Sequence, residues 1–159
     1  MAVVDFFLKI AGIKGESQEL KHKNEIEVEA WSWGLTNPGA AAPAGAGKPT
    51  FQDFSFVKRV DRSSPRLALA SATGEHIPQA ILAVRRPTGR VSFEFLKVTL
   101  SDVQVSGYQG TAEGTEAPPM DSFSLKFSKI EFSYTMQKED GSPDAPVTVG
   151  WDVKANKKV

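Results

Sequence analysis

The clearest alternation of polar and apolar residues in the chain lies between residues 25 and 35. From 25 to 29 every second residue is a glutamate, and Ile26 and Val28 stand between them. Successive side chains of a strand point to opposite faces, so this pattern predicts a strand, within about residues 22–35, with one buried and one solvent-facing side. The parity then changes, because the next large apolar residues are Trp31 and Trp33.

Two structures explain this change of parity. If the strand stays regular, both indoles share the face of the glutamates and meet solvent or a partner. If a bulge lies near Glu29 and Ala30, the faces exchange, Trp31 and Trp33 become core anchors, and Ser32 turns outward. We favour the bulge, because burying two tryptophans contributes several kcal/mol at about 25 cal/mol per Å². The solvent-facing polar stripe then consists of Glu25, Glu27, Glu29 and Ser32.

Similar changes of parity occur twice more. One lies between residues 91–95 and 96–100, and the other lies between 123–127 and 130–134, within a single predicted long strand. Repeated changes indicate coiled strands that each serve two sheets, as an antiparallel barrel requires. Further strands are predicted at 3–10, 51–60, 79–86, 102–108 and 147–153, with long loops at 37–49 and 110–119.

One short helix is predicted, with Ser64 as its N-cap, Pro65 at its first position and Gly74 as its terminator. Its alanine-rich sequence includes Leu67 and Leu69, so we expect it to cover a sheet edge or a barrel end. The predicted fold class is mainly β: an antiparallel β-barrel formed by two sheets, with one short α-helix on its side and long loops. We expect residues 1–159 to form a single domain.

Composition narrows the possible functions. The chain has 19 basic and 19 acidic residues, so no long-range field recruits nucleic acid or an anionic membrane, and low net charge leaves self-association unopposed. It has no cysteine, which removes disulfides, thiolate catalysis and thiolate metal sites. The N-terminus has no signal-peptide pattern, and no apolar run approaches the roughly 20 residues of a membrane span. Any export is therefore expected to use a route without a signal peptide.

Candidate catalytic and cofactor sites are weak. His22 and His76 are isolated in the sequence, which predicts no metal site. Residues 44–50 resemble the end of a phosphate-binding loop but have proline where serine or threonine is needed. Two arginine-containing groups are expected to form surface ion pairs or subunit contacts rather than anion sites: Asp61, Arg62 and Arg66, and Arg85, Arg86 and Arg90. We therefore expect no enzyme and no cofactor.

Several longer motifs occur in order along nearly the whole chain. They are K-G-E-S, A-W-S-W-G, S-P-R-L-A-L-A-S-A-T-G-E-H-I-P-Q-A, Q-K-E-D-G and G-W-D-V-K-A-N. Together they resemble the haemolysin-coregulated protein (Hcp) family of bacterial type VI secretion systems. The loop after A-W-S-W-G is the part where the resemblance is weakest.

The resemblance implies a homo-hexameric ring of β-barrel subunits whose central channel carries small effectors, with rings stacking into a tube. Implied partners are type VI effectors, spike and sheath components, with no nucleic acid and no membrane insertion. The implied location is the bacterial cytoplasm, followed by secretion through the apparatus. Ser32 of A-W-S-W-G would face the channel. Candidate contacts between subunits or rings lie in the small-residue loop: Pro38, Gly39, Ala44, Gly47 and Lys48. The alternative is a monomeric β-barrel that binds a small ligand.

Overall fold

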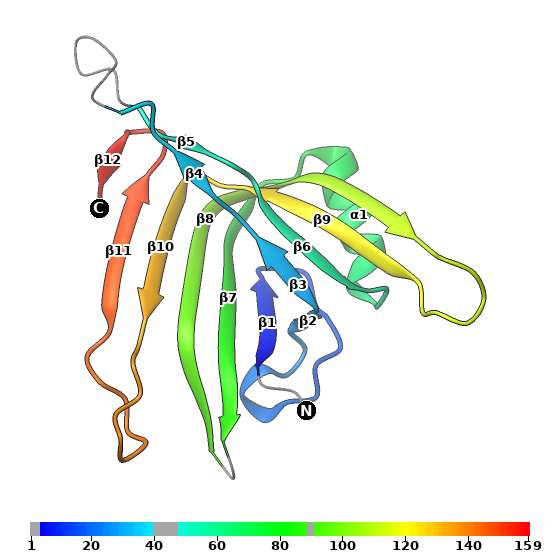
Figure 1. Ribbon diagram of the computed structural model, residues 1–159. Coiled ribbons are helices and arrows are strands. Elements are labelled where there is room, and N and C mark those ends of the chain that lie inside the picture. Colours follow the sequence, from blue (N-terminus) through cyan, green and yellow to red (C-terminus); the bar gives the residue numbers. More distant parts are fainter. Residues whose placement is uncertain (1–3, 40–47, 89–90) are drawn as a thin grey trace.

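The computed structural model describes residues 4–39, 48–88 and 91–159, whose strands form two antiparallel sheets (Figure 1). The first sheet contains, in order, β12 (Lys157–Lys158), β11 (Val147–Asp152), β10 (Lys129–Tyr134), β8 (Val91–Thr111), β7 (Ile77–Thr88), β1 (Asp5–Ile10) and β2 (Ile26–Val28). The second contains β8, β9 (Met120–Lys126), β6 (Phe54–Arg59) and β3 (Ala30–Ser32). The predicted mainly β class, with two antiparallel sheets and one helix, is confirmed.

The two sheets share β8, which is 21 residues long. Its first half pairs with β7 and β10, and its second half pairs with β9. Between the halves Asp102 adopts a φ of 52°, a left-handed conformation that aspartate tolerates better than most residues. The strand therefore changes direction there and continues as a member of the second sheet.

The predicted irregularity near residue 95 is confirmed. The pair Arg85–Glu94 is followed by Val84–Leu96, so Phe95 has no partner in the ladder with β7. This extra residue moves the apolar positions of β8 from odd to even numbers, which keeps them on the core side of the sheet.

The other two changes of parity have a different structural cause. The predicted strand through Glu29 is interrupted there rather than bulged, because β2 pairs with β1 whereas β3 pairs with β6. The predicted long strand from 123 to 134 is likewise two strands, β9 and β10, which belong to different sheets. At both places the chain crosses between sheets, so its apolar residues remain on the side of the common core.

The core lies between the sheets and is rich in phenylalanine. Phe54 stacks on Phe56 at 5.0 Å between ring centroids, and Phe56 stacks on Phe123 at 5.2 Å. All three side chains are buried. Backbone pairing leads from β2 through β1, β7, β8, β9 and β6 to β3, which follows β2 in the chain, so the strands surround this core.

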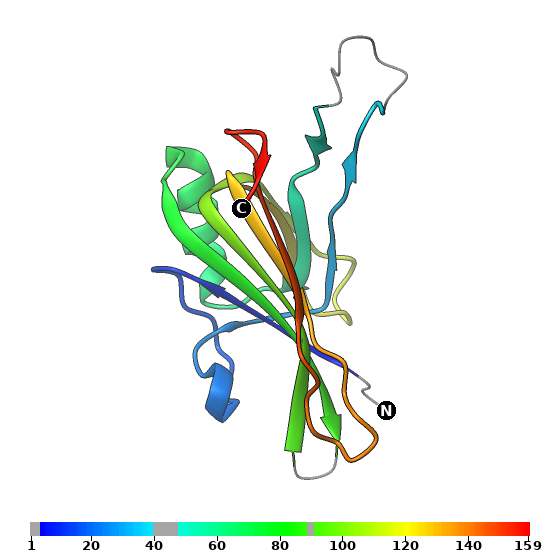
Figure 2. The ribbon, with the colours of Figure 1, turned by 90° about the vertical axis from the view of Figure 1, so that its left-hand side faces the viewer.

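Helix α1 (Ser63–Thr73) packs against β8 on the outside of the sheets (Figures 1 and 2). The predictions of Ser64 as N-cap and of Pro65 as the first helical residue are wrong, because the helix begins two residues earlier, at Ser63, with Arg62 at the N-cap position. The Oδ1 of Asp61 accepts the Ser63 N–H at 2.8 Å, so it satisfies a free helical donor that the Ser64 hydroxyl does not reach. Gly74 ends the helix as predicted, with a φ of 69°.

A buried polar cluster joins the start of α1 to the sheets. The Nζ of Lys58, which is fully buried, lies 3.1 Å from Asp61 Oδ1, 2.9 Å from Ser64 Oγ and 3.0 Å from Asp121 Oδ1. The Tyr108 hydroxyl donates to Asp121 Oδ2 at 2.8 Å. Burial and this hydrogen bond raise the pKa of Tyr108. Because a buried charge is costly unless paired, these contacts hold β6, β8, β9 and α1 together.

Lys58→Ala is expected to lower the free energy of unfolding by about 3 to 5 kcal/mol, because it leaves the Asp121 carboxylate buried without its cationic partner. Urea unfolding followed by circular dichroism measures this loss. Lys97→Ala, on an exposed lysine of β8, is the matched control and should be nearly neutral. Equal stability of the two variants would show that the cluster does not stabilise the fold.

Candidate functional site

Ser32 is exposed and lies at one end of a row of small residues on the outer face of the second sheet. It pairs with Ser55 of β6, which pairs with Ser124 of β9, which pairs with Gly107 of β8. We call these four residues the serine row. They come from four adjacent strands, so the row crosses the full width of this sheet.

The surface over the serine row is hollow and uncharged at its centre. A shallow depression of about 370 Å³ is lined by Ser55, Gly107 and Ser124, together with the adjacent Val57 and Ser122. No bulky side chain rises from the row, because its members are serine or glycine. The centre of this surface is therefore neutral and bears hydroxyl groups.

A hydrogen-bonded group borders the serine row near β8. The Ser106 hydroxyl donates to Asp53 Oδ2 at 2.6 Å and lies 2.8 Å from the Ser124 hydroxyl. Sequence reasoning found only Ser32 of this surface. The alternation of phenylalanine and serine around Ser55 and Ser124 was visible, but only the strand register brings these residues beside Ser32.

Trp31 and Trp33 point to the opposite, core side of the chain from Ser32 and are half-buried. Trp31 contacts Phe6 edge-on at 6.1 Å and Phe54 at 5.8 Å. Trp33 stacks on Phe54 at 5.8 Å. Both indoles therefore extend the phenylalanine stack of the core while keeping one edge in solvent.

A second feature is an apolar surface on β10 and β11, toward one edge of the first sheet (Figure 1). Tyr134 pairs with Val147, and Phe132 pairs with Val149. We call these four residues the apolar face. Val147 and Val149 are 69% and 62% exposed, which is high for large apolar side chains on paired strands.

Beside the apolar face lies a cavity of about 420 Å³. Its other wall comes from a two-stranded ribbon of β4 (Leu35–Thr36) and β5 (Thr50–Phe51). The indole N–H of Trp151 is buried at this cavity and has no hydrogen-bond partner among the described residues. The ribbon projects from the body of the molecule in Figure 2.

The predicted contact residues of the small-residue loop are only partly described. Pro38 and Lys48 are exposed. Gly39 adopts a φ of 82°, and its N–H donates to Asn37 Oδ1 at 2.7 Å. Ala44 and Gly47 lie outside the described residues, as does most of the stretch that resembles a phosphate-binding loop.

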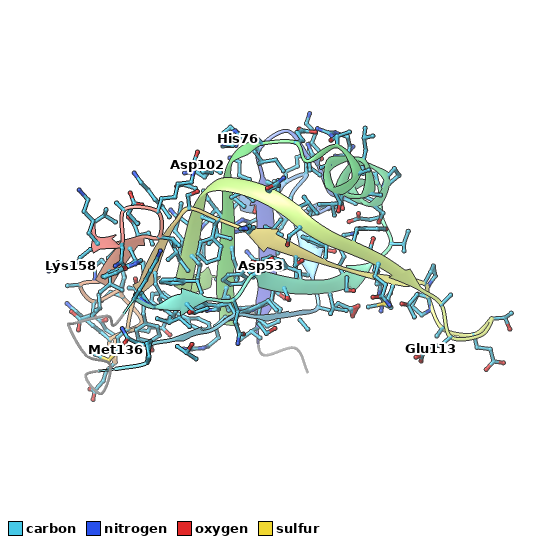
Figure 3. All side chains as sticks on the ribbon, turned by 90° about the horizontal axis from the view of Figure 1, so that it is seen from above. Asp53, His76, Asp102, Glu113, Met136 and Lys158 are labelled. Atoms are coloured by element: carbon cyan, nitrogen blue, oxygen red, sulfur yellow. The ribbon has the colours of Figure 1, made fainter. Side chains whose placement is uncertain are left out.

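Both histidines contact carboxylates, although they are isolated in the sequence. His22 lies between Glu25 and Glu94, at 2.9 Å and 3.0 Å, and stacks on a phenylalanine ring. His76 and Asp102 form an exposed pair at 3.0 Å, side by side in Figure 3. Within residues 4–39, 48–88 and 91–159, no three His, Cys, Asp or Glu side chains are placed to hold a metal ion. In the same ranges no helix has the length and hydropathy of a membrane span.

The described arginines of the two predicted groups do not form shared anion sites, because each binds different residues. Arg62 donates to the Gly15 carbonyl, and Arg66 forms two hydrogen bonds with Glu75, which lower the pKa of that carboxyl. Arg85 contacts Asp5 and Glu19, in agreement with the expected ion pairing. Arg90 lies outside the described residues.

Comparison with known proteins gives one consistent result. The family model described as "Type VI secretion system effector, Hcp" matches residues 7–134. "Protein hcp1" of Pseudomonas aeruginosa is 40% identical over 157 residues, which cover 96% of this chain and 97% of that protein. The crystal structure of Hcp1 from Salmonella typhimurium is 35% identical with a TM-score of 0.80, covering 99% of this chain and 100% of the other. A type VI secretion system effector from Yersinia pestis is 31% identical with a TM-score of 0.77, covering 94% and 100%.

Trp31→Ala and Trp33→Ala should each lower the free energy of unfolding by roughly 3 kcal/mol, the lower part of the range for large-to-small core changes, because each indole keeps one exposed edge. Matched Trp→Phe variants retain a ring against Phe54 and should lose much less. Urea unfolding of the four variants tests this. A neutral alanine variant would mean that the indole does not support the core.

Proposed function

This chain belongs to the Hcp family of type VI secretion proteins, and from this we propose that it is a single-domain, ring-forming structural subunit of the type VI inner tube. It acts as a structural and transport component rather than as an enzyme. The observation that carries the proposal is the apolar face, where Val147 and Val149 are exposed on a paired sheet. The subunit forms a homo-hexamer in the bacterial cytoplasm and leaves the cell through the secretion apparatus.

Two properties of the surface support ring formation. A contiguous exposed apolar patch favours a partner, and head-to-tail contacts between identical subunits close into a ring when the rotation permits. The formal net charge of zero leaves association unopposed by repulsion between subunits. The apolar face therefore forms one half of the contact between neighbours in the ring.

The serine row lines the channel in this proposal. A wall of hydroxyls and glycine binds cargo without a strong field or a deep pocket, which suits effectors of different sequence. Ser32 is the member that belongs to the A-W-S-W-G motif. The loop between β4 and β5, with the candidate residues Pro38, Gly39, Ala44, Gly47 and Lys48, contacts neighbouring subunits or rings in the stacked tube. Sheath and spike components are further partners of the assembly.

A monomeric barrel that binds a ligand inside itself is less well supported. Phe54, Phe56 and Phe123 stack between the two sheets, where such a ligand would lie.

Val149→Asp should convert hexamers to smaller species, because it places a charge on the exposed part of the apolar face. Thr148→Asp is the matched control. Thr148 is exposed on the other side of β11, where its hydroxyl lies beside that of Ser133, so this variant should still form hexamers. Light scattering at micromolar concentration separates the two outcomes. Hexamers of Val149→Asp that are as stable as the control would exclude this face from the ring contact.

Ser32→Arg should leave rings intact and impair retention of effector, because a bulky cation enters the neutral wall of the channel. Co-purification of an effector with rings of the variant, compared with Ser32→Ala, measures the effect. If Ser32→Arg unfolds the subunit, Ser32 is a core residue instead, and unchanged retention would remove it from the cargo surface.

A further inference from the structure

A hollow of about 690 Å³ near the start of the chain is strongly basic. Six cationic residues and one carboxylate, Glu25, line it. Of the cations, Arg66 is paired with Glu75, outside the lining. Among the described residues none of its four lysines takes part in an ion pair, and all four are exposed. The cationic residues are Lys9, Lys14, Lys21, Lys23, Arg62 and Arg66.

The backbone beneath these lysines is rigid. The Gly15 N–H donates to the Asn24 carbonyl at 2.8 Å, and the Ser17 N–H donates to the Glu25 carbonyl at 3.0 Å. A Cβ on Gly15 would lie 2.5 Å from the Glu25 carbonyl oxygen, so only glycine allows this close approach. Arg62 adds a hydrogen bond from its Nε to the Gly15 carbonyl at 2.6 Å. The lysines are therefore displayed from a fixed surface.

A complementary acidic feature lies at the tip of the β8–β9 hairpin, which projects from the body with Glu113 near its end (Figure 3). Residues 98–125 contain no lysine or arginine. Glu113 and Glu116 are exposed, and neither has an ion pair among the described residues. We call residues 112–118 the acidic tip. Its other side chains are small or proline, so it is narrow enough to enter a hollow.

The acidic tip cannot turn back onto the hollow of its own subunit. Thr111 and Met120 remain paired at the base of the tip, and the Val60 N–H donates to the Pro119 carbonyl at 3.1 Å. These contacts fix the direction in which the hairpin projects. Any ion partner of the tip therefore comes from another molecule.

We propose that the acidic tip of one subunit docks into the basic hollow of a second copy of this chain. Four unpaired lysines face two unpaired glutamates, so opposite charges meet and neither set is neutralised within its own subunit. Leu20, 90% exposed at the rim of the hollow, packs against the alanine and proline residues of the tip. The two surfaces are unlike, as a head-to-tail contact requires. This contact rests on the proposed self-assembly and adds a second interface to the apolar face.

Charge exchange in the full chain tests the contact. Glu113→Lys with Glu116→Lys should raise the concentration for half-assembly by about tenfold or more, because like charges then meet across the interface. Lys14→Glu with Lys21→Glu should have a similar effect. Combining all four changes should restore assembly, because the charges are again opposite. Native mass spectrometry follows rings, and electron microscopy follows tubes.

Glu131→Lys with Glu139→Lys is the matched control, since it makes the same change of charge at exposed glutamates elsewhere and should leave assembly intact. The proposal is overturned if the tip variant assembles like the wild type, or if the four-change variant remains as weak as either parent. If the lysine variant alone loses binding to heparin, with assembly unchanged, the hollow serves a foreign polyanion instead. If the wild type forms hexamers while the contact between tip and hollow fails these tests, the proposed ring function still holds and only the contact is rejected.

Discussion

The structure depends on one constraint: a single strand, β8, belongs to both sheets. It can do so because Asp102 turns left-handed between its two halves and because extra residues at Phe95 and Ser106 shift its register. Each irregularity keeps large apolar side chains on the core side while the strand changes partners. The same requirement explains the crossing of the chain between sheets at Glu29, where Trp31 and Trp33 join the core and Ser32 faces outward. The buried Lys58 cluster then fixes the helix to the second sheet.

This arrangement gives the molecule surfaces of distinct chemistry on different elements. The outer face of the second sheet is small and hydroxyl-bearing, the free edge of the first sheet is apolar, the hollow lined by lysines near the start of the chain is basic, and the β8–β9 tip is acidic. Exposed apolar side chains such as Val147 and Val149 remain in contact with water in a monomer, whereas an assembly of identical subunits can cover them. Membership of the Hcp family and the chemistry of the surface therefore both support a structural protein that assembles with other components.

Much of the fold was predictable from the order of polar and apolar residues, because strand periodicity records which face is buried. The break near Glu29, the irregularity at Phe95 and the end of the helix at Gly74 all left signals in the sequence. Three features of the structure left no signal that could be read from neighbouring residues in the sequence. Lys58 stands near the end of the predicted strand at 51–60, and nothing local marks it as buried, because its partner Asp121 is 63 residues away along the chain. The serine row depends on the register of four strands, and the basic hollow depends on chain packing around Gly15. Such features require the tertiary structure because their members are distant in sequence.

We propose that this subunit works as a closed ring of identical copies. Native mass spectrometry of the unmodified full chain, at micromolar concentration and moderate ionic strength, tests it most directly. A dominant hexamer is the predicted result. A dominant monomer, in which the apolar face stays exposed to solvent, would contradict the proposal.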